Sequence, residues 1–281
     1  MRHTVFHAAA RKFKADQHSL VVQWAGGLIQ PSILKEDIRR VADVATGAGN
    51  WLIDIAKELD NPTNVYKGFD VSPAQFPLDT TDAIGGFDFV QHNMLERFPV
   101  AYHGQFDLVN IRLVVQAVKA ADVPLIVSNL KGLLRPGGYL QWQDLVWNDV
   151  RPDPYQQDIQ DIVEIIRAHM NKHGLSQDLP ALARSGMEQA GLQEVTFAKK
   201  TREDCLPPLR PEYVSSLARH ALVFMLPKVL ETKMISENKA VDTAAIKAQA
   251  AQLAIRLDQV YADGYNTAPT YVVVVGKRPL K

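Results

Sequence analysis

Short apolar runs alternate with segments of helical periodicity between residues 39 and 144. The run over residues 39–45 predicts a buried strand, and the apolar positions of residues 50–59 recur on one face, as in a helix. Later runs, such as residues 108–111 and 139–142, show little polar alternation. Strands of that kind are typical of a parallel sheet that helices cover on both faces. The pattern therefore predicts a doubly wound α/β sheet.

Two glycines, Gly47 and Gly49, fall between the first predicted strand and its helix. Glycine permits backbone conformations that a Cβ opposes, and it lets a ligand lie against bare amides at a helix N-terminus. A second apolar run, residues 65–69, ends in Asp70, where a carboxylate in a βαβ unit accepts hydrogen bonds from ribose hydroxyls. Alone, the glycines are equally consistent with a tight turn. Together with Asp70 they indicate a nucleoside site.

The residues around the glycines distinguish between kinds of nucleoside. A dinucleotide loop has a third glycine, but Gly49 is followed by Asn50, Trp51 and Leu52. The motif also contains an acid, Asp43, which repels a phosphate and favours a cationic or amine-bearing ligand. A nicotinamide dinucleotide is therefore the weaker alternative.

Residues 43–51 resemble the glycine-rich motif of class I S-adenosylmethionine-dependent methyltransferases. Four later segments resemble further elements of that family in the same order, so the likeness extends over residues 15–145. These segments are residues 69–77, 92–95, 106–112 and 133–140. Residues 69–77 are similar to the version found in small-molecule methyltransferases of fungal secondary metabolism. The resemblance implies a Rossmann-like, mostly parallel seven-stranded sheet, with S-adenosyl-L-methionine as the cofactor.

The resemblance also implies which residues hold the cofactor. Gly47 and Gly49 shape the loop around the methionine part, together with Ala45, which stands where the family often has glycine. Asp43 is expected at the amino end of the methionine, either directly or through water. Asp70 is expected at the ribose.

Two further strand ends complete the predicted cofactor site. Asn93 and Met94 follow the third strand and are expected to flank the adenine, the amide through hydrogen bonds and the thioether through soft contact with the ring. Arg112 stands at the end of the fourth strand. It either anchors the cofactor carboxylate or pairs with Asp107 as part of the scaffold.

Beyond residue 144 the simple alternation ends. Helical patterns cover residues 155–173, 179–189, 212–230 and 243–261, and short strands are predicted at residues 195–198 and 271–276. We expect one domain, residues 1–281, in which a helical lid lies over an α/β core. The core comprises about 36–147, 179–200 and 268–281, and the lid comprises 1–35, 148–178 and 201–267.

Residues 16–34 have a helical pattern that Gly26 and Gly27 interrupt. Most of this segment is expected to cover the sheet. In the resembling enzymes, N-terminal helices also close over the cofactor and contribute to dimers. Gln17 and His18 are therefore candidate substrate-pocket residues, and a homodimer through the N-terminal helices is expected.

The lid supplies the remaining candidates. Leu222, Phe224 and Met225 suggest an apolar substrate pocket, although each alone is more consistent with core packing. Methyl transfer requires a base only when the acceptor atom is protonated at neutral pH. His220 is the candidate base because it lies on an apolar helix, where burial keeps an imidazole neutral; the alternative is a structural or surface histidine.

Composition narrows the range of partners. The 281 residues contain 31 Lys plus Arg and 31 Asp plus Glu, so no net field attracts nucleic acid or an anionic membrane. The single cysteine, Cys205, excludes an internal disulfide and a cysteine-based zinc site; this suits a reducing cytoplasm, and no metal is expected. No run of about 18 apolar residues predicts a membrane span, and no signal peptide is expected.

These observations predict S-adenosylmethionine-dependent methyl transfer to an O or N atom of a small, largely apolar natural product. One alternative is an enzyme of the same fold that catalyses a cyclisation or dehydration, in which the sulfonium charge assists without methyl transfer. Another is a non-catalytic regulator of this fold, which has less need of a large apolar lid. Methyl-transfer assays distinguish the first function from the second.

Overall fold

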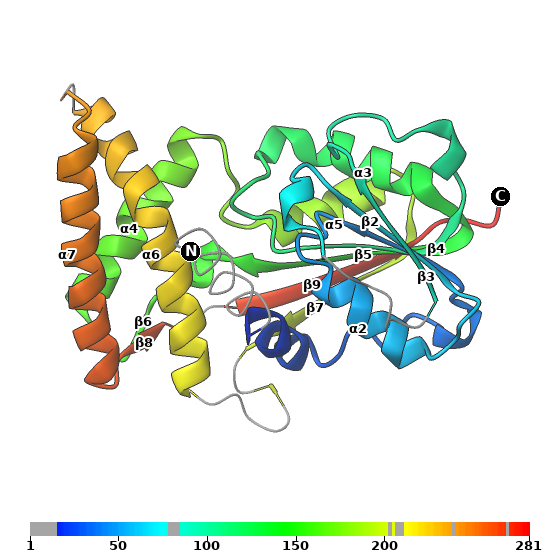
Figure 1. The fold of residues 1–281 in the computed structure, drawn as a ribbon, viewed down its shortest axis with the longest axis horizontal. Coiled ribbons are helices and arrows are strands. Elements are labelled where there is room, and N and C mark those ends of the chain that lie inside the picture. Colours follow the sequence, from blue (N-terminus) through cyan, green and yellow to red (C-terminus); the bar gives the residue numbers. More distant parts are fainter. Residues whose placement is uncertain (1–15, 78–84, 202–203, 206–210, 238–239, 268–269) are drawn as a thin grey trace.

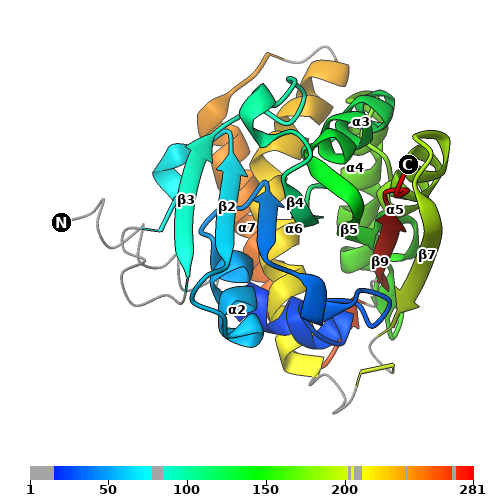
Figure 2. The ribbon, with the colours of Figure 1, turned by 90° about the vertical axis from the view of Figure 1, so that its right-hand side faces the viewer.

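A seven-stranded sheet is the centre of the computed structural model, which describes residues 16–77, 85–201, 204–205, 211–237, 240–267 and 270–281 (Figure 1). The strand order is β3-β2-β1-β4-β5-β9-β7, seen from one edge to the other in Figure 2. The strands are β1 (Arg40–Val44), β2 (Val65–Asp70), β3 (Gly86–Gln91), β4 (Phe106–Arg112), β5 (Leu134–Val146), β7 (Gln193–Lys200) and β9 (Thr270–Lys277). β1 to β5 pair in parallel, and β9 is antiparallel to both of its neighbours. The mostly parallel, doubly wound sheet predicted from the sequence is confirmed.

Both faces of the sheet are buried, because neighbouring residues of each strand face opposite sides. Val41 and Leu108 pack with the helix over residues 16–25 and with α2 (Asn50–Leu59). Ala42 and Val109, one residue further on, belong to the second cluster, with α3 (Val123–Leu133) and α5 (Leu179–Gln189). This two-sided burial explains why the strand sequences are apolar without alternation.

Three long helices stack beside one another at one end of the molecule, at the left in Figure 1. They are α4 (Gln157–Lys172), α6 (Pro211–Ser236) and α7 (Thr243–Ala262), each in contact with the other two. A two-stranded ribbon, β6 (Pro152–Asp153) with β8 (Asn266–Thr267), lies at their base. Short 3₁₀ turns complete the fold: η1 (Lys35–Asp37), η2 (Pro73–Gln75), η3 (Val100–Tyr102), η4 (Ala120–Asp122) and η5 (Trp147–Asp149).

Two boundaries differ from the predicted ones. The N-terminal helix ends at residue 25 and does not resume, because Gly26 and Gly27 take φ angles of 82° and 137° that turn the chain. β5 continues to Val146, since its last residues pair with β9 as far as Thr270. In the described part of the chain, no helix is long and apolar enough to span a bilayer.

Candidate functional site

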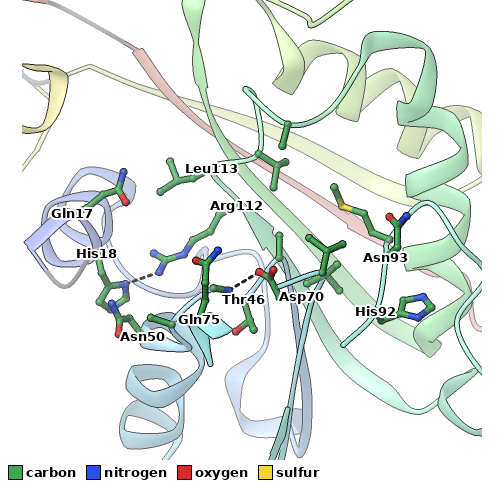
Figure 3. Close-up of a pocket in the computed structure, with 18 residues that line it drawn as sticks. Gln17, His18, Thr46, Asn50, Asp70, Gln75, His92, Asn93, Arg112 and Leu113 are labelled. Atoms are coloured by element: carbon green, nitrogen blue, oxygen red, sulfur yellow. Dashed lines mark hydrogen bonds between the residues drawn. The ribbon is translucent and has the colours of Figure 1, made fainter. Parts of the chain in front are cut away.

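A cavity of about 480 Å³ lies at the carboxyl ends of the parallel strands (Figure 3). Ligands of doubly wound sheets bind at this edge, because the loops after neighbouring strands converge there. The helix over residues 16–25 contributes a further wall. The lining residues are Gln17, His18, Val44, Ala45, Thr46, Gly47, Ala48, Asn50, Asp70, Val71, Gln75, His92, Asn93, Met94, Arg112, Leu113, Val114 and Ala117.

The loop between β1 and α2 has a left-handed backbone at three positions. Gly47 and Gly49 have φ angles of 56° and 73°, which glycine adopts without strain. A Cβ at Gly49 would lie 3.0 Å from the Phe89 ring, so a larger residue would press against that ring. Ala45 has a φ of 57° and carries a Cβ, which costs about 1 to 2 kcal/mol. The loop therefore stores strain at the residue where the resembling family often has glycine.

Asp70, the last residue of β2, connects this loop to the neighbouring strand. Its Oδ2 atom accepts a hydrogen bond from the Gly47 amide at 2.9 Å, and its Oδ1 atom accepts one from the Ser72 amide at 2.9 Å. The carboxylate lines the cavity. A carboxylate oxygen accepts more than one hydrogen bond, so Asp70 retains acceptor capacity toward a ligand.

Asp43 lies behind the loop and is not among the residues that line the cavity. Only 2% of the residue is exposed. Oδ1 accepts from the Asn110 amide at 2.8 Å, and Oδ2 accepts from the Thr46 hydroxyl at 2.7 Å. Burial raises the pKa of this carboxyl group. Asp43 therefore supports the loop from within the sheet, because both of its oxygens are already bonded to the protein.

Arg112 and His18 form a polar contact at the other end of the cavity (Figure 3). The guanidinium Nη2 donates to His18 Nδ1 at 2.8 Å. A guanidinium has no acceptor, so Nδ1 is unprotonated, and Nε2–H donates to Asp54 on α2 at 2.9 Å. Burial, with help from the Arg112 charge, lowers the pKa of His18 to about 4. His18 is thus a neutral link between three elements, and both of its ring nitrogens are occupied.

The predicted alternative, a scaffold pair between Arg112 and Asp107, is wrong. Asp107 pairs instead with Arg135, and it accepts hydrogen bonds from the amides of Arg39 and Arg40 at 2.7 Å each. Arg112 is left with one buried nitrogen, Nη1, that finds no partner among the described residues. An unpaired buried cationic donor is costly, which points to an anionic group of a ligand.

Asn93 lies on the opposite side of the cavity from Gln17 and His18 (Figure 3), and Met94, the next residue, also lines the cavity. Their backbone is fixed from two directions. Asn93 Oδ1 accepts from the Leu95 amide at 3.1 Å, and the Met94 carbonyl accepts from Asn129 on α3 at 2.9 Å. Six of the eight predicted cofactor residues therefore line the cavity. Of the other two, Gly49 is the N-cap of α2 and Asp43 lies behind the loop.

The predicted lid residues do not join this cavity. Leu222 and Met225 are 1% and 6% exposed, and they pack in the core between the sheet and the helices α4, α6 and α7. The side chains of Phe224 and His220 lie outside the described residues. The correction has a simple cause: an apolar helix face packs against other helices as readily as it lines a pocket.

Sequence reasoning overlooked several residues. Gln75, Leu113, Val114 and Ala117 line the cavity from loops that directly follow strands, and their position after a strand end was the available signal. His169 and His173 are spaced i,i+4 on α4, and a ring nitrogen of each approaches Thr232 Oγ1, at 2.9 and 3.2 Å. Among the described residues, no group of three or more His, Cys, Asp or Glu is arranged to hold a metal.

Comparison with known proteins finds similar sequences for part of this chain. Residues 42–140 match a family described as "Methyltransferase domain". Methyltransferase grgD of Penicillium sp is 36% identical over 176 residues, 59% of this chain and 60% of that protein. N-methyltransferase sirN of Leptosphaeria maculans is 33% identical over 127 residues (45% and 43%), and N-methyltransferase verN of Clonostachys rogersoniana is 28% identical over 127 residues (45% and 44%). The matches therefore span between 43% and 60% of these relatives.

Proposed function

We propose that this chain, whose residues 42–140 match a methyltransferase domain, belongs to the class I S-adenosylmethionine-dependent family and methylates a small, largely apolar molecule of secondary metabolism. One observation carries the proposal. The Gly47 amide, in the loop after β1, bonds the Asp70 carboxylate at the end of β2, so the loop and the acid expected at a nucleoside form one wall. The acceptor atom we propose is nitrogen, because two of the three relatives described above are named N-methyltransferases.

The cavity fits the cofactor of this family. Its volume of about 480 Å³ is within the range of about 300 to 1,000 Å³ that small-molecule sites occupy. S-adenosylmethionine carries ribose hydroxyls, which suit the free acceptor capacity of Asp70, and a carboxylate, which suits the unpartnered Nη1 of Arg112. The two groups lie on different walls of the cavity (Figure 3).

The order of the strands gives the proposed direction of the cofactor. Asn93 and Met94 follow β3 and would flank the adenine, and Asp70 ends β2 and would hold the ribose. The loop of Ala45 and Gly47 follows β1 and would surround the methionine part. Gly49 starts α2, and Arg112 at the end of β4 would bind the carboxylate.

The protein's part in the reaction is positioning. The bound cofactor supplies a methyl group on a sulfonium, and an acceptor lone pair displaces the sulfide in line. Holding the two reactants in that geometry supplies about 7 to 11 kcal/mol in favourable cases. His18 is not assigned a proton-transfer role, because both of its ring nitrogens are bonded. His220 stays our proposed base for acceptors that are protonated at neutral pH.

We further propose the organisation of the whole chain. Residues 1–281 would form one domain in which the α4, α6 and α7 layer and the N-terminal segment cover the core, with Gln17 and His18 at the pocket. A homodimer through the N-terminal helices, a cytoplasmic location and the absence of nucleic-acid partners belong to the same proposal. Sedimentation of the purified protein at several concentrations tests the dimer.

The test is calorimetric titration with S-adenosylmethionine, S-adenosylhomocysteine and NAD. We expect the first two to bind and NAD not to bind. Asp70→Ala should weaken binding by about tenfold or more, as expected for a lost hydrogen bond to a charged group. Asp88→Asn on β3 is the matched control, because Asp88 is exposed and contacts only Lys67 among the described residues.

Absence of binding to both S-adenosylmethionine and S-adenosylhomocysteine would overturn the proposal. Binding without methyl transfer to any amine, amide or hydroxyl acceptor would favour the non-methylating alternative.

A further inference from the structure

A buried carboxylate outside the proposed cofactor contacts, Asp144 on β5, holds the loop that follows β4. Asp144 has no exposed surface. Its Oδ2 atom accepts from the Val114 amide at 2.8 Å, and its Oδ1 atom accepts from the amide of Leu145 at 3.0 Å. Burial raises the pKa of this carboxyl group to about 7. Burying a carboxyl group in the sheet core is costly, and the two hydrogen bonds from backbone amides offset part of that cost.

The loop that Asp144 holds is strained and lines the cavity. Leu113 has a left-handed φ of 56°, which costs a residue with a Cβ about 1 to 2 kcal/mol. Such a conformation persists only where surrounding bonds over-determine it. Here the Leu113 amide donates to the Gln143 carbonyl at 3.0 Å, next to the bond between Val114 and Asp144. Neighbouring strand β5 thus fixes two successive amides of the turn.

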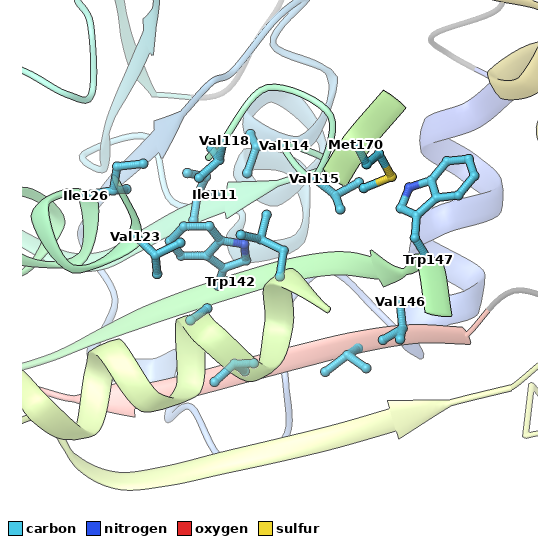
Figure 4. Close-up of a cluster of buried hydrophobic side chains, with 14 of the residues drawn as sticks. Ile111, Val114, Val115, Val118, Val123, Ile126, Trp142, Val146, Trp147 and Met170 are labelled. Carbon is cyan, nitrogen blue, oxygen red and sulfur yellow. The ribbon is translucent and has the colours of Figure 1, made fainter. Parts of the chain in front are cut away.

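The turn divides its side chains between the core and the cavity. Val115 and Val118 are buried in the cluster around Trp142 (Figure 4), and Val114 belongs both to this cluster and to the cavity wall. Leu113, Val114 and Ala117 line the cavity, and Leu113 lies beside Arg112 in Figure 3. A shift of the turn would therefore move three apolar side chains of the cavity wall together.

The strand order indicates which reactant this wall faces. The sheet runs β3-β2-β1-β4, and the proposed cofactor contacts begin after β3, pass β2 and the loop after β1, and end at Arg112, the last residue of β4. The turn after β4 follows on the side away from the proposed adenine contacts. A methyl acceptor approaching the sulfonium would meet this wall, because the adenine and ribose lie toward the other side.

We propose that Asp144 is a positioning residue for methyl transfer, which holds the strained Leu113–Val114 turn as the acceptor-side wall of the cavity. The inference rests on the proposed function. It assigns Asp144 no contact with the cofactor or the acceptor. Its effect passes through the Val114 amide, so a variant should change how the acceptor is held and leave cofactor binding nearly unchanged.

Two variants and a control test the proposal. Asp144→Ala removes both acceptors, whereas Asp144→Asn keeps one oxygen that can accept from Val114. Asp149→Asn is the control, because Asp149 lies in the turn just after β5 and pairs with Lys199 on β7. In hydrogen exchange, we expect the Val114 amide to exchange at least about tenfold faster in Asp144→Ala, nearer the wild-type rate in Asp144→Asn, and unchanged in Asp149→Asn.

Kinetics provide the second readout. We expect Asp144→Ala to raise the KM for the acceptor about tenfold with a smaller change in kcat, while the Kd for S-adenosylhomocysteine stays within about twofold. Partial rescue by Asp144→Asn distinguishes positioning from general loss of folding. Wild-type exchange of Val114 in Asp144→Ala, or a KM like that of Asp149→Asn, would overturn the inference. If the wild type transfers no methyl group, the proposed function fails, and so does the role of Asp144 in methyl transfer. The hydrogen-exchange rate of the Val114 amide then decides by itself whether Asp144 holds the turn.

Discussion

Arg112 at the end of β4 donates a hydrogen bond to His18 Nδ1 across 2.8 Å, and this contact connects the sheet edge to the N-terminal helix. The same histidine donates to Asp54 on α2. A second polar route runs in parallel inside the sheet, where the Gln141 side chain bonds the Leu28 carbonyl, the Gln30 amide and Asn110. The N-terminal segment is therefore tied to α2, to β5 and to the end of β4, which lines the cavity.

The His18 contact predicts a pH dependence of stability. The folded-state pKa is lowered from 6.5 to about 4, so the unfolded chain binds the proton more readily between these values. The contribution of neutral His18 to the free energy of unfolding is therefore fully present above pH 6.5. It decreases by about 3 kcal/mol in total as the pH falls toward 4. Asp144, whose folded pKa is raised to about 7, contributes the opposite slope over an overlapping range. The two contributions partly cancel in the wild-type protein, so its pH dependence alone does not reveal the effect of His18.

The measurement compares wild type with His18→Gln, which does not titrate but can donate to Asp54 and accept from Arg112. Urea unfolding at pH 7.5, 6, 5 and 4 gives the difference in free energy of unfolding. We expect wild type to lose about 3 kcal/mol relative to the variant over this range, because the Asp144 contribution is common to both. A difference that stays constant with pH would show that His18 titrates normally in the folded protein.

Arg112 predicts selectivity for a ligand carboxylate. If its unpartnered Nη1 binds the carboxylate of S-adenosylmethionine, Arg112→Met loses a charge-assisted hydrogen bond of about 1.5 to 3 kcal/mol. The Kd should rise about 10- to 100-fold for S-adenosylmethionine and much less for its decarboxylated analogue. Calorimetric titration of both ligands measures this, with His18→Gln as the control that retains the guanidinium. Equal losses for the two ligands would instead assign Arg112 to the scaffold.

Sequence reasoning was most successful where burial alone decides the pattern. The strands and helices from β1 to β5 followed from apolar periodicity, and Asp70, Asn93 and Met94 followed from their positions after strand ends. The pairing of Asp107 required the strand register. Val41 lies opposite Leu108 in the parallel pair, so Asp107 is beside Arg40 at the start of β1. Arg112, five residues further along β4, is about 17 Å away at about 3.3 Å per residue.

For the lid residues and for Asp43, the sequence pattern does not determine which groups the side chains contact. Leu222 and Met225 satisfy the same apolar pattern whether they face other helices or a ligand, and only the packing of α4, α6 and α7 distinguishes these cases. Asp43 belongs to a motif expected at the ligand, yet its oxygens are bonded to Asn110 and Thr46. Asn110 is far away in the sequence, and nothing in the motif itself identifies it as the partner.

Ala45 predicts a stabilising substitution. Its left-handed φ of 57° costs about 1 to 2 kcal/mol, and Ala45→Gly would remove this strain while adding about 0.5 to 1 kcal/mol of unfolded-state entropy. We expect a net gain of about 0.5 to 1 kcal/mol in the free energy of unfolding, measured by urea denaturation. Ala48→Gly in the same loop is the matched control, because Ala48 has no positive φ to relieve. A loss of stability in Ala45→Gly, equal to that in Ala48→Gly, would contradict the strain argument.

The contacts of Asp107 predict that its hydrogen bonds to backbone amides contribute more to stability than its ion pair with Arg135. The carboxylate accepts from two backbone amides at the start of β1, those of Arg39 and Arg40, and it is only 7% exposed. Asp107→Ala should cost about 1 to 3 kcal/mol, because it leaves those amides without an acceptor. Arg135→Met removes the ion pair and a long hydrogen bond to the Asp37 carbonyl but keeps the Asp107 carboxylate, and because the Arg135 side chain is 46% exposed it should cost less than about 1 kcal/mol. Urea denaturation measures both variants, and calorimetry should show cofactor affinity unchanged in each, because Asp107 is at the opposite end of β4 from the cavity. Equal destabilisation by the two substitutions would assign the stabilisation to the ion pair and contradict this ranking.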